Sequence, residues 1–232
     1  MGIDNVPANN TWKLSSLNTQ VPPVSVHPQS QLATVTWLNG SSAWLYYQDT
    51  NLQLREYGID DYRDTIWRNG ALGPLGLALE GTGIGTARYL LDGGEVLEVF
   101  IQTDNNAIHG RVYQDSIWEA DFYSVDGTNT DLSPNAALTA TTVYQDTVRV
   151  FLAWVSSSGF LNIQSRDTVN VTQYNTFSDP KQMAEGDGGE QQGLAATGIY
   201  SGEPGGARVY FADGEKILEL GGNGTNWTTV SL

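Results

Sequence analysis

The stretch WLYYQDTNLQLRE, from Trp44 to Glu56, decides the fold of this chain. It joins an aromatic run to a polar turn and ends on Arg55 and Glu56, a pattern typical of two short antiparallel strands linked by a tight turn. A single copy would be an ordinary hairpin, whereas several copies at a fixed period would make the chain a repeat protein. The number of copies in the chain therefore decides between these two folds.

Four segments of similar order follow one another along the sequence. The first strand of each begins at residue 32, 84, 138 or 194, in steps of 52, 54 and 56 residues. A second strand follows as WLYYQ, EVFIQ, RVFLA or RVYFA, and a third as LQLREY, NAIHGRVY, FLNIQS or KILELG. The fourth strand is marked by an aromatic residue: Trp67, Trp118, Tyr174 or Trp227.

These segments are rich in Val, Ile, Thr and aromatic residues and are separated by Gly, Asn, Asp and Ser, as short strands and tight turns are. Four strands recurring about every 50 residues predict the blades of a β-propeller. We expect an all-β fold with an N-terminal extension over 1–29 and one propeller domain over 30–232. Its blades are expected at about 30–77, 78–132, 133–189 and 190–232.

One copy of the outer strand has no blade ahead of it. Trp12 lies 55 residues before Trp67, within the range of 51 to 56 residues that separates the outer-strand aromatics of successive blades. The sequence therefore predicts four recognisable four-stranded blades plus an extra N-terminal outer strand. Coincidental similarity within an ordinary β-sandwich is the alternative fold.

Composition excludes several function classes. The formal net charge of −15 repels nucleic acid and anionic lipid, and no stretch approaches the roughly 18 apolar residues of a membrane span. The chain has no cysteine and two histidines far apart, so we expect no cofactor and no metal. The opening lacks the apolar core of a signal peptide, as a mature form would. Five Asn-x-Ser/Thr sites favour a secreted glycoprotein: Asn9, Asn39, Asn170, Asn223 and Asn226.

The repeated hairpin resembles the repeats of the fungal fucose-specific lectins, a family of six-bladed propellers. Their repeats read roughly R-V-Y-x-Q, a short turn and I-x-E, with a Trp about eight residues later. The resemblance covers about four blades, from residue 30 to the end, and six blades at this period would need about 300 residues. It implies a lectin without catalytic activity, whose partners are glycans, including fucosylated oligosaccharides. In the family each pocket takes Arg and Glu from one blade and Tyr and Trp from the next.

The fourth blade keeps both charged members of this motif. Arg208 stands in ARVYFA and Glu219 in ILEL, and the resemblance implies that Trp12 or Trp67 supplies the aromatic wall. A guanidinium donates to sugar oxygens, a carboxylate accepts from hydroxyls, and an aromatic face covers the apolar side of the ring. The methyl group of fucose suits such an aromatic face.

The other blades keep less of the motif. The first keeps Glu56, facing Tyr113 and Trp118, but has Trp44 in place of Arg. The third keeps Arg149 opposite Trp227, but FLNIQS supplies no carboxylate. The second has Glu98 for Arg and Gly110 for Glu, so we expect no sugar pocket there and no effect on binding of a change at Glu98.

Other interpretations remain open at this stage. Arg208 and Glu219 are equally consistent with a cross-strand ion pair, and a Trp once per blade with blade-to-blade core. The chain could then be a structural or protein-binding propeller that has lost sugar binding. A glycosidase needs two carboxylates flanking a bond, and acidic residues are frequent here. Because joined weak sites gain avidity, we also expect a homo-oligomer.

Overall fold

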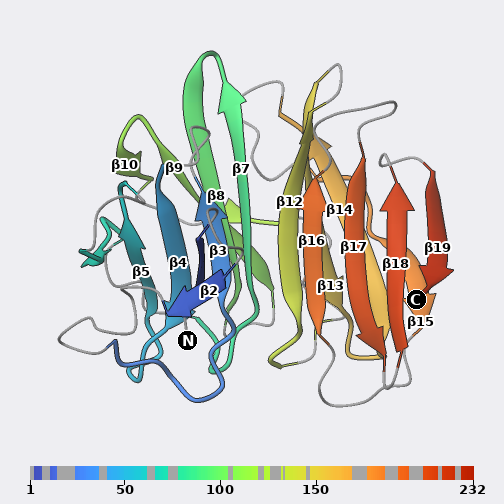
Figure 1. Cartoon of the computed structure of the whole chain (residues 1–232). Coiled ribbons are helices and arrows are strands. Elements are labelled where there is room, and N and C mark those ends of the chain that lie inside the picture. Colours follow the sequence, from blue (N-terminus) through green and yellow to red (C-terminus); the bar gives the residue numbers. More distant parts are fainter. Residues whose placement is uncertain are drawn as a thin grey trace.

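The computed structural model describes residues 3–6, 11–14, 24–36, 41–61, 66–72, 78–103, 107–119, 123–125, 132, 134–144, 147–168, 177–185, 193–198, 206–213, 216–222 and 226–232. Every regular element in these ranges is a β-strand (Figure 1). They include no helix of the length and apolar character needed to cross a membrane.

Four antiparallel sheets follow one another along the chain, each with its strands in sequence order, and we call them blades 1 to 4. Blade 1 consists of β3 (Ala33–Thr36), β4 (Ala43–Gln48), β5 (Leu54–Ile59) and β6 (Arg68–Asn69). Blade 2 consists of β7 (Ile84–Leu91), β8 (Gly94–Gln102), β9 (Ile108–Gln114) and β10 (Ile117–Trp118), and β11 (Tyr123–Ser124) also pairs with β9. Blade 3 consists of β12 (Leu138–Tyr144), β13 (Val148–Val155), β14 (Phe160–Asp167) and β15 (Lys181–Glu185). Blade 4 consists of β16 (Leu194–Gly198), β17 (Ala207–Asp213), β18 (Lys216–Gly222) and β19 (Trp227–Ser231).

The predicted propeller fold is confirmed, and its inner strands lie side by side around a hollow of ≈ 480 Å³. The Thr86 hydroxyl on β7 donates to the Thr34 carbonyl on β3 at 3.0 Å. The Thr142 hydroxyl on β12 donates to the Arg88 carbonyl on β7 at 2.6 Å. A Cβ at Gly198 would lie 1.8 Å from the Thr142 carbonyl oxygen, so only glycine lets β16 approach β12 this closely. The predicted strand starts at 32, 84, 138 and 194 are therefore equivalent levels of adjacent blades.

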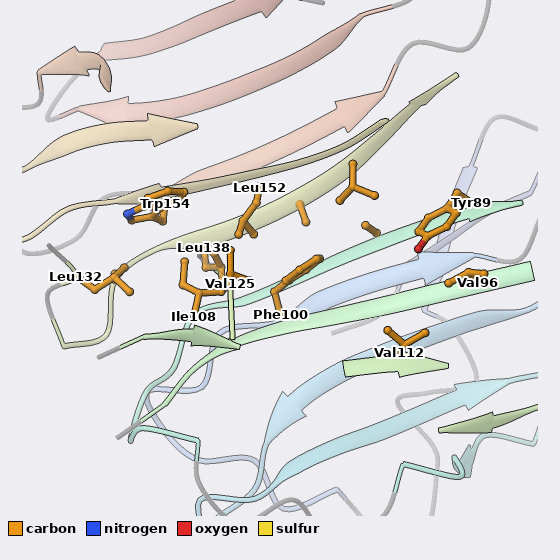
Figure 2. Close-up of a cluster of buried hydrophobic side chains, with 14 residues drawn as sticks. Tyr89, Val96, Phe100, Ile108, Val112, Val125, Leu132, Leu138, Leu152 and Trp154 are labelled. Atoms are coloured by element: carbon orange, nitrogen blue, oxygen red, sulfur yellow. The ribbon is translucent and has the colours of Figure 1, made fainter. Parts of the chain in front are cut away.

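Buried side chains fill the space between successive blades. We call the face of a blade that packs against the next blade its forward face, and the opposite one its rear face. Figure 2 shows Tyr89 and Phe100 on the forward face of blade 2 in one buried cluster with Leu152 and Trp154 on the rear face of blade 3. Similar clusters join blade 1 to blade 2 and blade 3 to blade 4. Each junction is thus a core built from two sheets.

The extra N-terminal strand is also present. It is β2 (Thr11–Leu14), which contains Trp12 and pairs with β1 (Ile3–Val6) in a separate two-stranded sheet. Among the described strands it joins none of the four blades. In blade 3 the predicted marker Tyr174 lies outside the described residues, and the outer strand β15 begins at Lys181. The proposed domain boundary at residue 30 stays a prediction.

The forward face of blade 4 differs from the other three because no described blade covers it. Ile217 on this face is 49% exposed. The equivalent side chains in blades 1 to 3, two residues before the matched position on the third strand, are all 0% exposed: Leu54, Ile108 and Leu161. Val230 and Leu232 of β19 and the chain end lie beside Ile217 and are 52% and 68% exposed. Blade 4 therefore presents an open face with apolar residues.

Candidate functional site

The hydrogen-bonded register fixes which positions of the four blades are equivalent. In blade 4, Arg208 lies between Thr197 and Gly221, and Tyr210 lies opposite Glu219. Residues opposite each other on adjacent strands point to the same face, so Arg208, Tyr210 and Glu219 share the forward face. The three equivalent positions hold Trp44, Tyr46 and Glu56 in blade 1, Glu98, Phe100 and Gly110 in blade 2, and Phe151, Ala153 and Ile163 in blade 3.

In blade 4 the two charged members of the predicted pocket meet. Arg208 Nε lies 3.1 Å from Glu219 Oε1, and the two side chains are 36% and 27% exposed. Desolvation, the charge of Glu219 and a hydrogen bond with its carboxylate raise the pKa of Tyr210. A Cβ at Gly221 would lie 2.2 Å from Arg208 Nη1, so the guanidinium rests across a strand position that only glycine leaves open. The result is a guanidinium, a carboxylate and a phenol within reach of solvent.

In blade 1 the equivalent carboxylate is closed off. Glu56 is 8% exposed, and its Oε1 accepts from the Tyr46 hydroxyl at 2.6 Å. Its Oε2 accepts from the backbone N–H of Leu72 at 3.1 Å. Burial and the adjacent Glu56 carboxylate raise the pKa of Tyr46. The structure brings Trp118 to 6.3 Å from the Tyr46 ring and 5.3 Å from the Tyr113 ring, as the motif predicts, but both carboxylate oxygens already have partners.

In blade 2 the position of Arg208 holds a buried carboxylate. Glu98 is 0% exposed, pairs with Arg166 of blade 3, and accepts a short hydrogen bond from Tyr89. The Tyr123 hydroxyl donates to Glu98 Oε2 at 3.0 Å. Burial acts to lower the pKa of Arg166, but Glu98, Tyr123 and Tyr89 together outweigh it and raise that pKa. A closed ion pair occupies this junction, which agrees with the expectation of no sugar pocket.

In blade 3 an arginine is present but its partner was missed by the sequence argument. Arg149 donates from Nε to Asp167 Oδ1 at 2.6 Å and from Nη2 to Oδ2 at 3.1 Å. This hydrogen bond holds the pKa of Asp167 below its usual value. Asp167 comes two residues after FLNIQS, the segment in which no carboxylate was found. Arg149 is also not at the position equivalent to Arg208. Phe151 occupies that position, and Arg149 lies two residues before it on β13.

Trp227 and Trp67, two of the predicted aromatics, pack against other residues than Arg208. Trp227 packs edge-to-face on Phe151, with ring centroids 5.7 Å apart, and so belongs to the core between blades 3 and 4. Trp67 stacks on Tyr57 of blade 1 at 6.1 Å, and Figure 1 places that blade at the opposite end of the row from blade 4. The side chain of Trp12 lies outside the described residues. Tyr210 lies directly opposite Glu219 and is an aromatic residue on the same face as the Arg208–Glu219 pair.

Sequence reasoning missed four residues that the structure shows to matter. Tyr210 and Tyr46 could have been found, because each stands two residues after the Arg208 position in RVY and WLY and shares its face. Asp167 could have been found by extending the third strand. Arg166 could not, because it reaches Glu98 across a blade junction, 68 residues away in sequence.

The arrangement on blade 4 suits recognition of a neutral polar molecule. Arg208 offers N–H donors in a planar fork and Glu219 offers acceptor oxygens, so adjacent hydroxyl groups could bridge them. No group of three or more His, Asp or Glu side chains that could hold a metal ion occurs among the described residues. The Arg208–Glu219 pair thus provides hydrogen-bond donors and acceptors side by side.

Most of the chain matches a known protein family. The family model for the fungal fucose-specific lectins matches residues 10–229. No curated protein sequence matches the chain.

Solved structures share the fold at low sequence identity. The lectin AofleA of Arthrobotrys oligospora is 18% identical with a TM-score of 0.76, over 99% of this chain and 64% of that one. The six-bladed propeller lectin of Aleuria aurantia is 20% identical with a TM-score of 0.70, over 95% of this chain and 66% of that one. The lectin BP39L of Burkholderia pseudomallei is 13% identical with a TM-score of 0.59, over 88% and 55%. The chain thus spans less than two thirds of the length of these lectins.

Proposed function

Because the chain belongs to the family of fungal fucose-specific lectins, we propose that it is a carbohydrate-binding module without catalytic activity, and that its sugar site is the Arg208–Glu219 pair. One observation carries the choice of site. In blade 1 the position of Arg208 holds Trp44, and Glu56 is closed off by Leu72. In blade 2 it holds Glu98, which is buried against Arg166, and in blade 3 it holds Phe151, with the partly exposed Arg149–Asp167 pair displaced from it. Of the four described blades, blade 4 has a guanidinium and a carboxylate at both equivalent positions, side by side and partly exposed.

The chemistry of the pair fits a pyranose. The guanidinium donates to ring and hydroxyl oxygens, and the carboxylate accepts from vicinal hydroxyls, which gives charge-assisted hydrogen bonds. Tyr210 and Val230 lie beside Glu219 on the same face and offer apolar contact. The methyl group of fucose would use that contact, and the Aleuria aurantia lectin has been solved in complex with α-methyl-L-fucoside. We therefore propose fucosylated glycans as the ligand class.

A glycan array tests the ligand class directly. Binding to fucosylated glycans, with little binding to matched glycans that lack fucose, is the expected result. Uniform absence of binding at high protein concentration would instead favour a structural or protein-binding propeller. Turnover of a chromogenic fucoside would contradict the non-catalytic assignment.

The position of Gly221 gives a second test of the site. Gly221→Ala places a Cβ where Arg208 Nη1 now lies, at 2.2 Å, so the guanidinium must move away. Because only the end of a flexible side chain is displaced, the fold should be kept, with a stability change below about 1 kcal/mol. Fucoside binding measured by calorimetry should weaken roughly tenfold or more, about 1.4 kcal/mol.

The matched control for that variant is Gly193→Ala in the same blade. A Cβ there would meet only Ala212 Cβ, at an ordinary contact distance of 3.5 Å. Its affinity should equal that of the parent protein. Equal affinity in Gly221→Ala as well would contradict the placement of the sugar at Arg208.

We also propose that the protein assembles as a homo-oligomer in which another copy covers the forward face of blade 4. The exposed Ile217, Val230 and Leu232 support this, because the position of Ile217 is fully buried in each of the other blades. Such a copy would also supply a second wall for the Arg208 site, whose face is covered by none of the described blades. Light scattering should show a mass above 25.2 kDa that grows with concentration, and a constant monomer mass would contradict it. Secretion remains part of the proposal, resting on the five Asn-x-Ser/Thr sites.

A further inference from the structure

The junction between blades 2 and 3 has the opposite polarity to the proposed sugar site. Where blade 4 has Arg208, blade 2 has Glu98, and the cation comes instead from Arg166 on β14 of blade 3. Both side chains are buried, with 0% and 2% of their surface exposed. A charge inside a protein is tolerated only when it is paired and hydrogen-bonded. The surroundings of Arg166 are therefore built for a cation.

Three kinds of contact hold the guanidinium. Glu98 Oε1 pairs with Arg166 Nη2, and the Tyr89 hydroxyl accepts from Nη2 at 3.3 Å. The Tyr123 and Phe177 rings flank the guanidinium, with centroids 5.8 and 5.1 Å from Cζ. A carboxylate combined with aromatic faces is the arrangement that proteins use for organic cations.

The Glu98 carboxylate also has hydrogen-bond partners other than Arg166. Glu98, Tyr89, Tyr123 and Phe177, which surround the guanidinium, are called the box below. Tyr89 and Tyr123 both donate their hydroxyl hydrogens to Glu98, one to each oxygen. Phe100 packs edge-to-face on both Tyr123 and Phe177, with centroids 6.4 and 6.1 Å away. The walls come mostly from blade 2 and its core, whereas the cation arrives from blade 3. The box and its occupant are thus separate parts.

We propose that the junction between blades 2 and 3 is a binding site for a guanidinium-type organic cation, walled by Glu98, Tyr89, Tyr123 and Phe177, and that Arg166 of the same chain fills it. This goes beyond sugar binding and predicts a ligand that the proposed lectin site would not take. Removing the Arg166 side chain should open the site to a free cation of the same shape.

The test is rescue of Arg166→Ala by methylguanidinium. Loss of Arg166 leaves Glu98 buried without its partner, so the Tm should fall by roughly 6–20 °C. Methylguanidinium chloride at millimolar concentration should then raise the Tm of the variant in a saturable way, because a ligand that binds only the folded state stabilises it. Sodium chloride at equal ionic strength should not. A variant that is folded and shows no rise specific to methylguanidinium would overturn the proposal.

Three controls make the result specific. Wild-type protein, whose site is full, and Arg55→Ala, which removes a partly exposed arginine paired with the buried Asp49, should not respond. Glu98→Gln/Arg166→Ala should lose the response, because the carboxylate is gone. If Arg166→Ala does not fold in buffer, it is refolded from urea with and without methylguanidinium: recovery only with the cation supports the site, and no difference overturns it. Rescue by fucose instead of methylguanidinium would also overturn it.

Discussion

Arg208→Ala should abolish detectable sugar binding while leaving the propeller folded. The guanidinium is the principal donor of the proposed site, and its removal leaves sugar oxygens without a donor and Glu219 without its ion pair, at roughly 1–3 kcal/mol per unsatisfied group. For a single weak pocket, that loss moves binding below detection. Circular dichroism should show an unchanged all-β spectrum, because the side chain is 36% exposed. Titration calorimetry with a fucoside measures the loss.

The control for this variant has to be an arginine of similar setting outside the site. Arg55→Ala is suitable, because Arg55 on β5 of blade 1 is 34% exposed and pairs with Asp49. It should bind sugar as the parent does. The sequence suggests Glu98 as a second control, because a change there is expected to leave sugar binding unchanged. Glu98 is fully buried against Arg166, however, so a change there tests stability instead. Unchanged affinity in Arg208→Ala would show that the family motif reports ancestry rather than a working site.

The fold could be predicted from the sequence because the information is local and repeated. Each blade is written as four short strands in order, and the starts at 32, 84, 138 and 194 proved to be matching levels of adjacent inner strands. Repetition averages out the weakness of any single strand signal. The use of Trp12 was harder to predict, since pairing between β1 and β2 depends on a partner strand that the repeat pattern did not mark.

The site was only partly predictable, because its decisive contacts cross between strands or blades. The motif located Arg208 and Glu219, which are direct neighbours in one sheet. It could not show that Leu72 closes the Glu56 carboxylate or that Arg166 fills the second junction, because these partners come from irregular or distant parts of the chain. Pattern reasoning finds donors and acceptors, whereas burial decides which of them remain available to a ligand.

Ile108→Ala should destabilise the protein far more than Ile217→Ala, although the two residues occupy equivalent positions of blades 2 and 4. Ile108 is 0% exposed in the core between blades 2 and 3, and truncating such a side chain costs about 2–5 kcal/mol in the free energy of unfolding. Ile217 is 49% exposed on the open forward face, so its truncation should stay within about 1 kcal/mol. Urea unfolding at low protein concentration measures both.

The comparison is sharp because the position in the blade is held constant and only the cover differs. Equal costs at low concentration would mean that the forward face of blade 4 is covered within one chain as well as that of blade 2 is. That result would contradict the open face of blade 4. If another copy covers this face, the cost of Ile217→Ala should grow with protein concentration, because association stabilises the parent by mass action. The cost of Ile108→Ala should not change, since its core lies within one chain. If the cost of Ile217→Ala does not change with protein concentration, the proposal that another copy covers the forward face of blade 4 is contradicted.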